Sequence, residues 1–106
     1  MTYKANVPQQ VIRDIDEAVF YKTQLDTYPE NIAKFINRLN EILWQQLETN
    51  PKFGSNLKTR IDVPTEVKYI VVGDYILFYE VEGNIVNVLR LLPAKSNWMS
   101  KILNYL

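Results

Sequence analysis

Residues 67–92 carry the sequence VKYIVVGDYILFYEVEGNIVNVLRLL, and the prediction of the fold starts there. Three runs in it, 67–72, 75–81 and 85–92, are rich in β-branched and aromatic residues, which favour strands. Two short segments that contain glycine separate the runs: Gly73-Asp74 and Glu82-Gly83-Asn84. Such segments are typical of hairpin turns, so the pattern predicts a meander of three antiparallel strands.

Upstream of the strands, two segments show the apolar spacing of amphipathic helices. In the first, from Pro8 to about Leu25, apolar residues recur three and four positions apart. In the second, from Pro29 to about Thr49, the periodicity is stronger, and Asn50-Pro51 ends it. Residues 26–29 break the chain between them, so we expect an antiparallel helical hairpin. The carboxylates of the first helix are expected in solvent, as surface charge and not as a metal site: Asp14, Asp16 and Glu17.

The two ends of the chain complete the expected fold. Residues 3–7 can form a short first strand, and residues 51–66 are expected to be irregular. After Pro93 the tail can form a short helix that places Trp98, Ile102 and Leu106 on one side. The order is therefore strand, helix, helix and three strands (β-α-α-β-β-β). Packing the hairpin on one face of the sheet gives a two-layer α+β fold, and a single domain is expected over residues 1–106.

The strands are apolar on both faces, which suggests that the sheet meets a partner. With a two-residue turn at Gly73-Asp74, one face holds Val71, Ile76, Phe78, Leu89 and Leu91, and we assign this face to the helices. The other face holds Lys68, Ile70, Tyr75, Leu77, Tyr79, Val88 and Arg90. It is more apolar than a free surface usually is, so we expect a partner on it. A three-residue turn would move Lys68 to the opposite face, and the sequence leaves this register open.

The composition argues against several classes of chemistry. The chain has no cysteine and no histidine, which removes disulfides, thiolate metal sites and the usual general base. Its 12 basic and 12 acidic residues cancel, which disfavours a general or sequence-specific nucleic-acid binder. The start has no secretory signal, and no apolar run approaches the length that spans a membrane. We therefore expect a cytoplasmic protein without a cofactor, a metal or a membrane partner.

The order of these elements at this length resembles the RelE/ParE toxin superfamily, the toxin halves of bacterial type II toxin–antitoxin pairs. The resemblance covers nearly the whole chain. It rests on the hairpin Gly73-x-Tyr75, the strand ends Tyr79-x-Val81 and Leu89-Arg90-Leu91, the break Asn50-Pro51-x-x-Gly54, and Lys95-Ser96-Asn97-Trp98 in the place of a basic segment that ends in tryptophan. The resemblance implies a toxin that a cognate antitoxin neutralises.

Members of the RelE branch cut messenger RNA on the ribosome, with lysines, arginines and a tyrosine that stabilise charge on the phosphate. The resemblance puts the hairpin arginine of those enzymes at Ile76 and their second strand lysine at Ile70. Lys68 and Lys95 keep a basic residue, and the terminal tyrosine has no clear counterpart. Each such donor is worth roughly 3–4 kcal/mol of transition-state stabilisation, so we assign no catalytic residue and disfavour cleavage.

Members of the ParE branch are associated with inhibition of DNA gyrase, and the region after their sheet is implicated in toxicity. That region is cationic here, because no acidic residue follows Glu82. The resemblance therefore implies a ParE-like toxin whose target-binding residues are Lys68, Arg90, Lys95, Trp98 and Lys101. We assign antitoxin binding to Tyr75, Leu77 and Tyr79.

Other interpretations of the same residues stay open. Lys95 and Lys101 are equally well explained as solvated lysines, and Trp98 as a lid on the core. At the level of function, the alternatives are a RelE-like ribosome-dependent endoribonuclease, acting on the ribosome and messenger RNA, and a non-toxic α+β interaction module. The sequence also leaves open whether the chain forms a homodimer.

Overall fold

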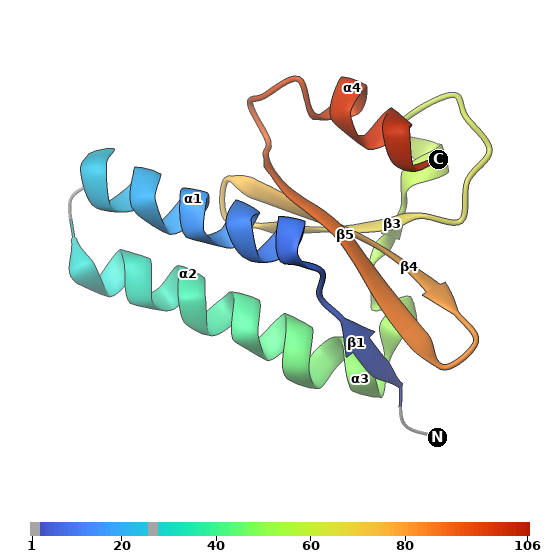
Figure 1. The fold of residues 1–106 in the computed structure, drawn as a ribbon, viewed down its shortest axis with the longest axis horizontal. Coiled ribbons are helices and arrows are strands. Elements are labelled where there is room, and N and C mark those ends of the chain that lie inside the picture. Colours follow the sequence, from blue (N-terminus) through green and yellow to red (C-terminus); the bar gives the residue numbers. More distant parts are fainter. Residues whose placement is uncertain (1–2, 26–27) are drawn as a thin grey trace.

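The computed structural model of the chain describes residues 3–25 and 28–106. Two short ranges, 1–2 and 26–27, lie outside the described residues. The first belongs to the start, where no signal was expected, and the second to the expected break between the helices. In chain order the structure contains β1 (Lys4–Asn6), α1 (Gln9–Leu25), α2 (Pro29–Glu41), α3 (Leu47–Thr49), β2 (Ser55–Asn56), β3 (Lys68–Val72), β4 (Tyr75–Glu82), β5 (Ile85–Pro93) and α4 (Trp98–Ile102) (Figure 1). This order confirms the predicted α+β fold class.

The helical hairpin forms one layer of the molecule, and α1 and α2 lie side by side in it (Figure 1). Pro29 stands in the first turn of α2, where the missing N–H costs nothing. A π-helical turn over Ile42–Gln46 joins α2 to α3, so the predicted second helix continues to Thr49. The spacing of the apolar residues does not reveal this π-helical turn. The turn adds one residue to the helix, but the buried face of the helix continues through it.

The sheet has five strands in the order β1-β5-β4-β3-β2. Its centre is the predicted meander, and Val72 pairs with Tyr75, so the β3–β4 turn has two residues. Gly73 adopts a φ of 62° in this turn, a conformation that glycine allows without strain. The two outer strands are short: β1 runs parallel to β5, and β2 pairs antiparallel with β3.

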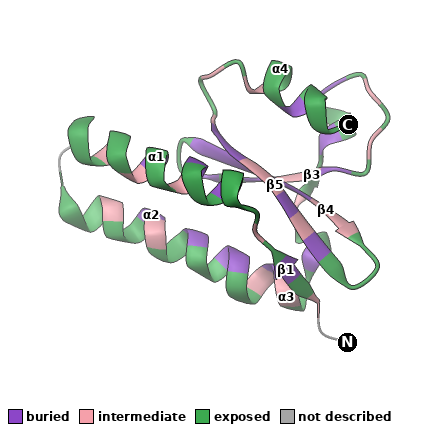
Figure 2. Cartoon of the chain, in the orientation of Figure 1, coloured by how far each residue is buried: buried purple, intermediate pink, exposed green. Residues whose placement is uncertain are grey.

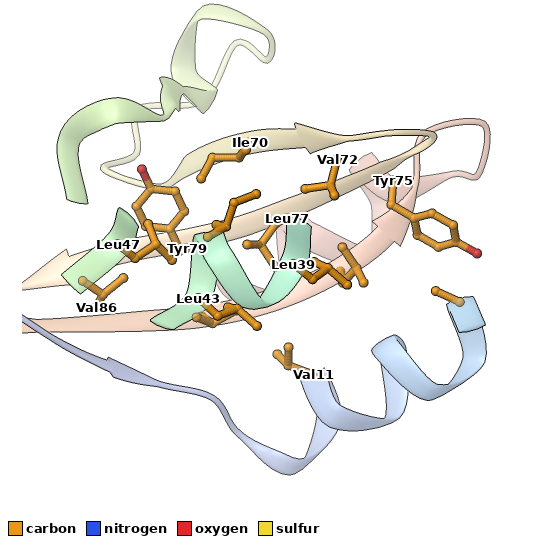
Figure 3. Packing of buried hydrophobic residues seen from close by; sticks show 14 of the residues in the cluster. Val11, Leu39, Leu43, Leu47, Ile70, Val72, Tyr75, Leu77, Tyr79 and Val86 are labelled. Atoms are coloured by element: carbon orange, nitrogen blue, oxygen red, sulfur yellow. The ribbon is translucent and has the colours of Figure 1, made fainter. Parts of the chain in front are cut away.

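The assignment of the two sheet faces is wrong. The helices cover the face that holds Ile70, Tyr75, Leu77, Tyr79 and Val88 (Figure 3). Alternation alone could not choose between the faces, because both are apolar. The register also shifts between Phe78, which pairs with Arg90, and Tyr79, which pairs with Val88. This bulge puts Leu91 under the helices, while Leu89 packs on the other side.

The second face of the sheet, on the side where a partner was expected, is largely covered by the chain itself. The irregular segment after β2 and α4 lie against it, on the side away from α1 and α2 (Figures 1 and 2). Ile102 of α4 is fully buried, and the ring centroids of Trp98 and Phe78 are 5.5 Å apart. This second cluster consists of Leu57, Ile61, Val67, Ile76, Phe78, Leu92 and Ile102. It fixes the position of the C-terminal segment.

Candidate functional site

Arg90 and Asp14 form the most buried ion pair of the described residues. Arg90 Nε donates to Asp14 Oδ2 over 2.7 Å, and Arg90 Nη2 donates to Asp14 Oδ1 over 3.0 Å. The two side chains are only 17% and 4% exposed. The backbone N–H of Leu91 also donates to Asp14 Oδ2, over 3.1 Å. The expectation that Asp14 lies in solvent is therefore wrong.

The spacing of α1 contained the signal for this pair. Asp14 follows Val11 by three residues and precedes Ala18 by four, and both apolar residues are fully buried. Residues at this spacing share one face of a helix, so Asp14 stands on the buried stripe. A carboxylate there needs a cation, and Arg90 is a base in the middle of an apolar strand.

Arg90 connects three parts of the molecule. The hydrogen bond to Asp14 raises the pKa of its guanidinium above the usual value, and the nearby Tyr105 hydroxyl contributes to the same shift. Arg90 thus joins α1, β5 and the C-terminal segment. Its predicted contact with a target stays a prediction, and its observed hydrogen bonds hold α1 against β5.

Lys101 and Arg90 line one cleft of about 200 Å³ between α1, the end of β5 and α4. Asp14, Glu17 and Tyr21 form the α1 wall of this cleft. The cleft is mixed in charge, because two carboxylates of α1 face two cations across it. It brings together two of the five predicted target residues.

The other predicted target residues lie in different places. Lys68 is on the helix-side face of β3, where its Nζ donates to Asn56 Oδ1 over 2.7 Å. Trp98 packs on the opposite face. Lys95 is exposed near the β3–β4 turn. The pKa of Asp74 in that turn is lowered, chiefly by a hydrogen bond from Lys22 and to a small extent by the charge of Lys95. Lys95, Trp98 and Lys101 thus belong to the C-terminal segment, while Lys68 stands apart.

The three residues assigned to antitoxin binding are core residues in this structure. Tyr75, Leu77 and Tyr79 are all buried beneath the helices. The Tyr79 hydroxyl donates to the carbonyl oxygen of Pro51 over 2.7 Å, and it accepts the N–H of Gly54 over 3.0 Å. Burial raises the pKa of both tyrosines. The antitoxin assignment rested on the wrong choice of face, so a surface for the antitoxin has to be sought elsewhere.

Sequence reasoning missed a pocket of about 180 Å³ on the α4 side of the sheet. Its walls include Tyr69, Val71, Ile76 and Trp98, and Arg60 stands beside them. Arg60 Nε donates to the Tyr69 hydroxyl over 2.8 Å, and the guanidinium carbon lies 5.4 Å from the centre of that ring. Arg60 belongs to an irregular segment without periodicity, so no pattern in the sequence pointed to it.

The described residues hold no group of three or more histidines, cysteines or acidic residues that could bind a metal ion. Ile76, in the place of the nuclease arginine, is buried in the second apolar cluster. In the same part of the chain, no helix is both long enough and apolar enough to cross a membrane.

Comparisons with known proteins agree with this fold. The family described as the ParE toxin of the type II toxin–antitoxin system parDE matches residues 7–98. The chain therefore belongs to the ParE toxin family, within the RelE/ParE superfamily, and is a toxin-type protein of a type II toxin–antitoxin system. No curated protein matches the sequence.

Two solved structures have the same fold. The chromosomal ParDE toxin–antitoxin system from P. aeruginosa has a chain that is 17% identical, with a TM-score of 0.67, and the match covers 88% of this chain and 97% of that one. The toxin–antitoxin complex RelBE2 from Mycobacterium tuberculosis is 16% identical, with a TM-score of 0.57, and the match covers 88% and 99% of the two chains. At these identities the likeness concerns the fold alone.

Proposed function

We propose that this chain is a cytoplasmic toxin that arrests growth by binding DNA gyrase and that a cognate antitoxin neutralises it. The match of the ParE toxin family over residues 7–98 carries this proposal. Toxicity of this kind requires binding to a large enzyme and no reaction by the toxin itself. That suits a chain that has neither histidine nor cysteine.

The C-terminal segment is the surface that we assign to the target. Lys95 and Lys101 are exposed, and Trp98 is partly exposed between them. Met99 in α4 and Leu103 just after it add exposed apolar side chains to this segment. Aromatic and apolar anchors beside cations are typical of binding hot spots. Because no acidic residue follows Glu82, this segment is also suited to a negatively charged partner surface.

Ribosome-dependent cleavage is the second candidate, and the arrangement of the basic residues argues against it. Stabilising a phosphate in the transition state requires several donors directed at one point. Lys68 and Trp98 lie on opposite faces of the sheet. The position of the nuclease arginine holds the buried Ile76. Among the described residues, the positions that match the nuclease set therefore do not converge on one point.

Induced expression in a bacterium separates the candidate functions. We expect growth arrest with filamentation and a DNA-damage response, while protein synthesis continues at first. Early arrest of translation, with messages cut at fixed codon positions on the ribosome, would instead establish the nuclease. Normal growth at high expression would favour the non-toxic interaction module.

A pair of double variants tests the assigned surface in the same cells. Lys95→Ala with Lys101→Ala removes both cations of the C-terminal segment and should relieve the arrest. Lys34→Ala with Lys52→Ala removes two exposed cations elsewhere and should leave the arrest unchanged. Equal toxicity of the two double variants, at equal protein levels, would remove the C-terminal segment from the site.

A further inference from the structure

A line of uncharged residues follows the outer side of α2 and continues into the π-helical turn after it. The line, which we call the α2 seam, consists of Ala33, Asn37, Asn40 and Trp44. All four residues are exposed, and Trp44 is 50% exposed (Figure 2). Their spacing of four, three and four positions is that of a heptad seam, through which two helices pack along each other. A solvated helix face usually carries charges, so the composition of this seam favours a helical partner.

The polar groups of the α2 seam have no hydrogen-bond partner among the described residues. The side-chain hydrogen bonds beside it run from Arg38 and from Gln46 to Glu41, over 2.8 Å each. They leave both amides of the seam and the indole N–H of its tryptophan free. These groups share one shallow hollow, which is lined by Asn37, Asn40, Glu41, Trp44 and Gln45. An amide both donates and accepts, so the hollow offers both kinds of hydrogen-bonding group to a partner.

The chemistry of the α2 seam fits a second copy of the same chain. The seam has no charge, so it gives neither a cationic nor an anionic partner an electrostatic advantage. In a two-fold dimer the same surface meets itself, and amides complement each other there because each one donates and accepts. The surface assigned to the target belongs to the C-terminal segment, on the other side of the sheet (Figure 1). A dimer through the seam therefore leaves that surface free in both copies.

We infer that two copies of the chain form a dimer in which their α2 seams pack antiparallel, about a two-fold axis that passes between Asn37 and Asn40. Residues equally far from this axis meet across it, so Asn37 faces Asn40 of the second copy. Ala33 of one copy then faces Trp44 of the other, since each lies four residues beyond an asparagine of the seam. A small side chain opposite a large one lets two helices approach closely. This inference does not depend on the proposed function.

Two charged residues beside the α2 seam agree with this antiparallel register. Lys34 and Glu41 stand on the same flank, because each comes one position after a residue of the seam. In an antiparallel pair the same flanks meet, so Lys34 approaches Glu41 of the second copy, and the symmetry repeats the contact. Lys34 forms no ion pair with any described residue, and Glu41 uses only its Oε1 in the contacts within the chain. Such exposed pairs add little affinity, but they favour one orientation.

A single introduced cysteine tests the axis directly, because the chain has no cysteine of its own. Asn40 lies next to the axis and therefore close to Asn40 of the second copy. A disulfide requires Cα atoms about 4.4–6.8 Å apart, a distance that helices packed along the seam allow. Under mild oxidation, Asn40→Cys should form a covalent dimer on a non-reducing gel. Ser100→Cys, at an exposed position of α4, is the matched control and should stay largely monomeric.

Sedimentation equilibrium over a series of protein concentrations measures the same association without a crosslink. The unsubstituted chain should show an equilibrium between monomer and dimer. Trp44→Ala should raise its dissociation constant about tenfold or more, because a tryptophan in the contact is a typical hot spot. Phe20→Ala removes an aromatic side chain of α1 that is also exposed, at 61%, and lies outside the α2 seam. It should leave the dissociation constant unchanged.

Each other outcome overturns the inference. A chain that stays monomeric at every concentration has no such dimer, and equal crosslinking of the two cysteine variants removes the axis from Asn40. A dimer that Trp44→Ala and Phe20→Ala weaken equally has its interface elsewhere. If Trp44→Ala weakens binding of the purified antitoxin and leaves self-association unchanged, the α2 seam belongs to the antitoxin.

Discussion

At the scale of single residues, buried polar groups join segments that are distant in the sequence. Asp14 accepts both the guanidinium of Arg90 and the N–H of Leu91, so one carboxylate fixes α1 against β5. Tyr79 joins β4 to the segment after α3, because its hydroxyl donates to the carbonyl oxygen of Pro51 and accepts the N–H of Gly54. A Cβ at Gly54 would collide with that hydroxyl, which gives glycine at this position a physical reason.

Asp14→Ala should lower the free energy of unfolding by about 3–5 kcal/mol, because it leaves Arg90 as an uncompensated, partly buried charge. Asp16→Ala, two residues away and exposed, should change it by less than about 0.5 kcal/mol. Urea unfolding followed by tryptophan fluorescence measures both. Similar midpoints for the two variants would contradict the assigned role of Asp14.

Tyr79→Phe should cost about 1–3 kcal/mol, because it leaves the N–H of Gly54 and the carbonyl of Pro51 without their partner. The cost should also depend on pH. Burial raises the pKa of Tyr79, so its contribution is fully present below the ordinary tyrosine pKa of about 10 and is lost as pH rises through the raised value. Unfolding midpoints of the two proteins should therefore converge in strong alkali. A constant difference would contradict this.

At the scale of elements, the turns made the strands predictable, whereas the apolar character of both sheet faces made the choice of the helix-covered face unpredictable. Gly73 and Gly83 both adopt a φ of 62°, and the strand bounds around them lie within about a residue of those expected. The bulge at Phe78 and Tyr79 left no mark in the sequence, because residues on both faces are apolar. Arg90 and Trp98 could be singled out from their types and positions. Arg60 and the pocket beside it could not, since they depend on where an irregular segment lies.

The docking of α4 depends on Ile102, its one buried residue. Ile102→Ala should release α4 from the sheet, because truncating a buried isoleucine costs about 2–5 kcal/mol and this short helix has few other contacts. In a Trp44→Phe background, the emission of Trp98 should shift to the red and become easier to quench. Leu103→Ala, which alters an exposed neighbour, should leave the emission unchanged. An unshifted spectrum in Ile102→Ala would show that other contacts hold the helix.

At the scale of the whole molecule, one sheet separates two apolar clusters with different tasks. The larger cluster lies under the helical hairpin and stabilises the fold. The smaller cluster lies under α4 and holds the cationic C-terminal segment against the sheet. The net charge of the chain is zero, but the residues after Glu82 include cations and no acidic residue. Binding to a target is therefore expected at this end.

The supercoiling of relaxed plasmid by purified DNA gyrase tests the gyrase proposal most directly. The unsubstituted chain should inhibit supercoiling and trap gyrase on cleaved DNA, while the variant with Lys95→Ala and Lys101→Ala should inhibit much more weakly. Full supercoiling activity in a large molar excess of the folded, unsubstituted chain would contradict the proposed function.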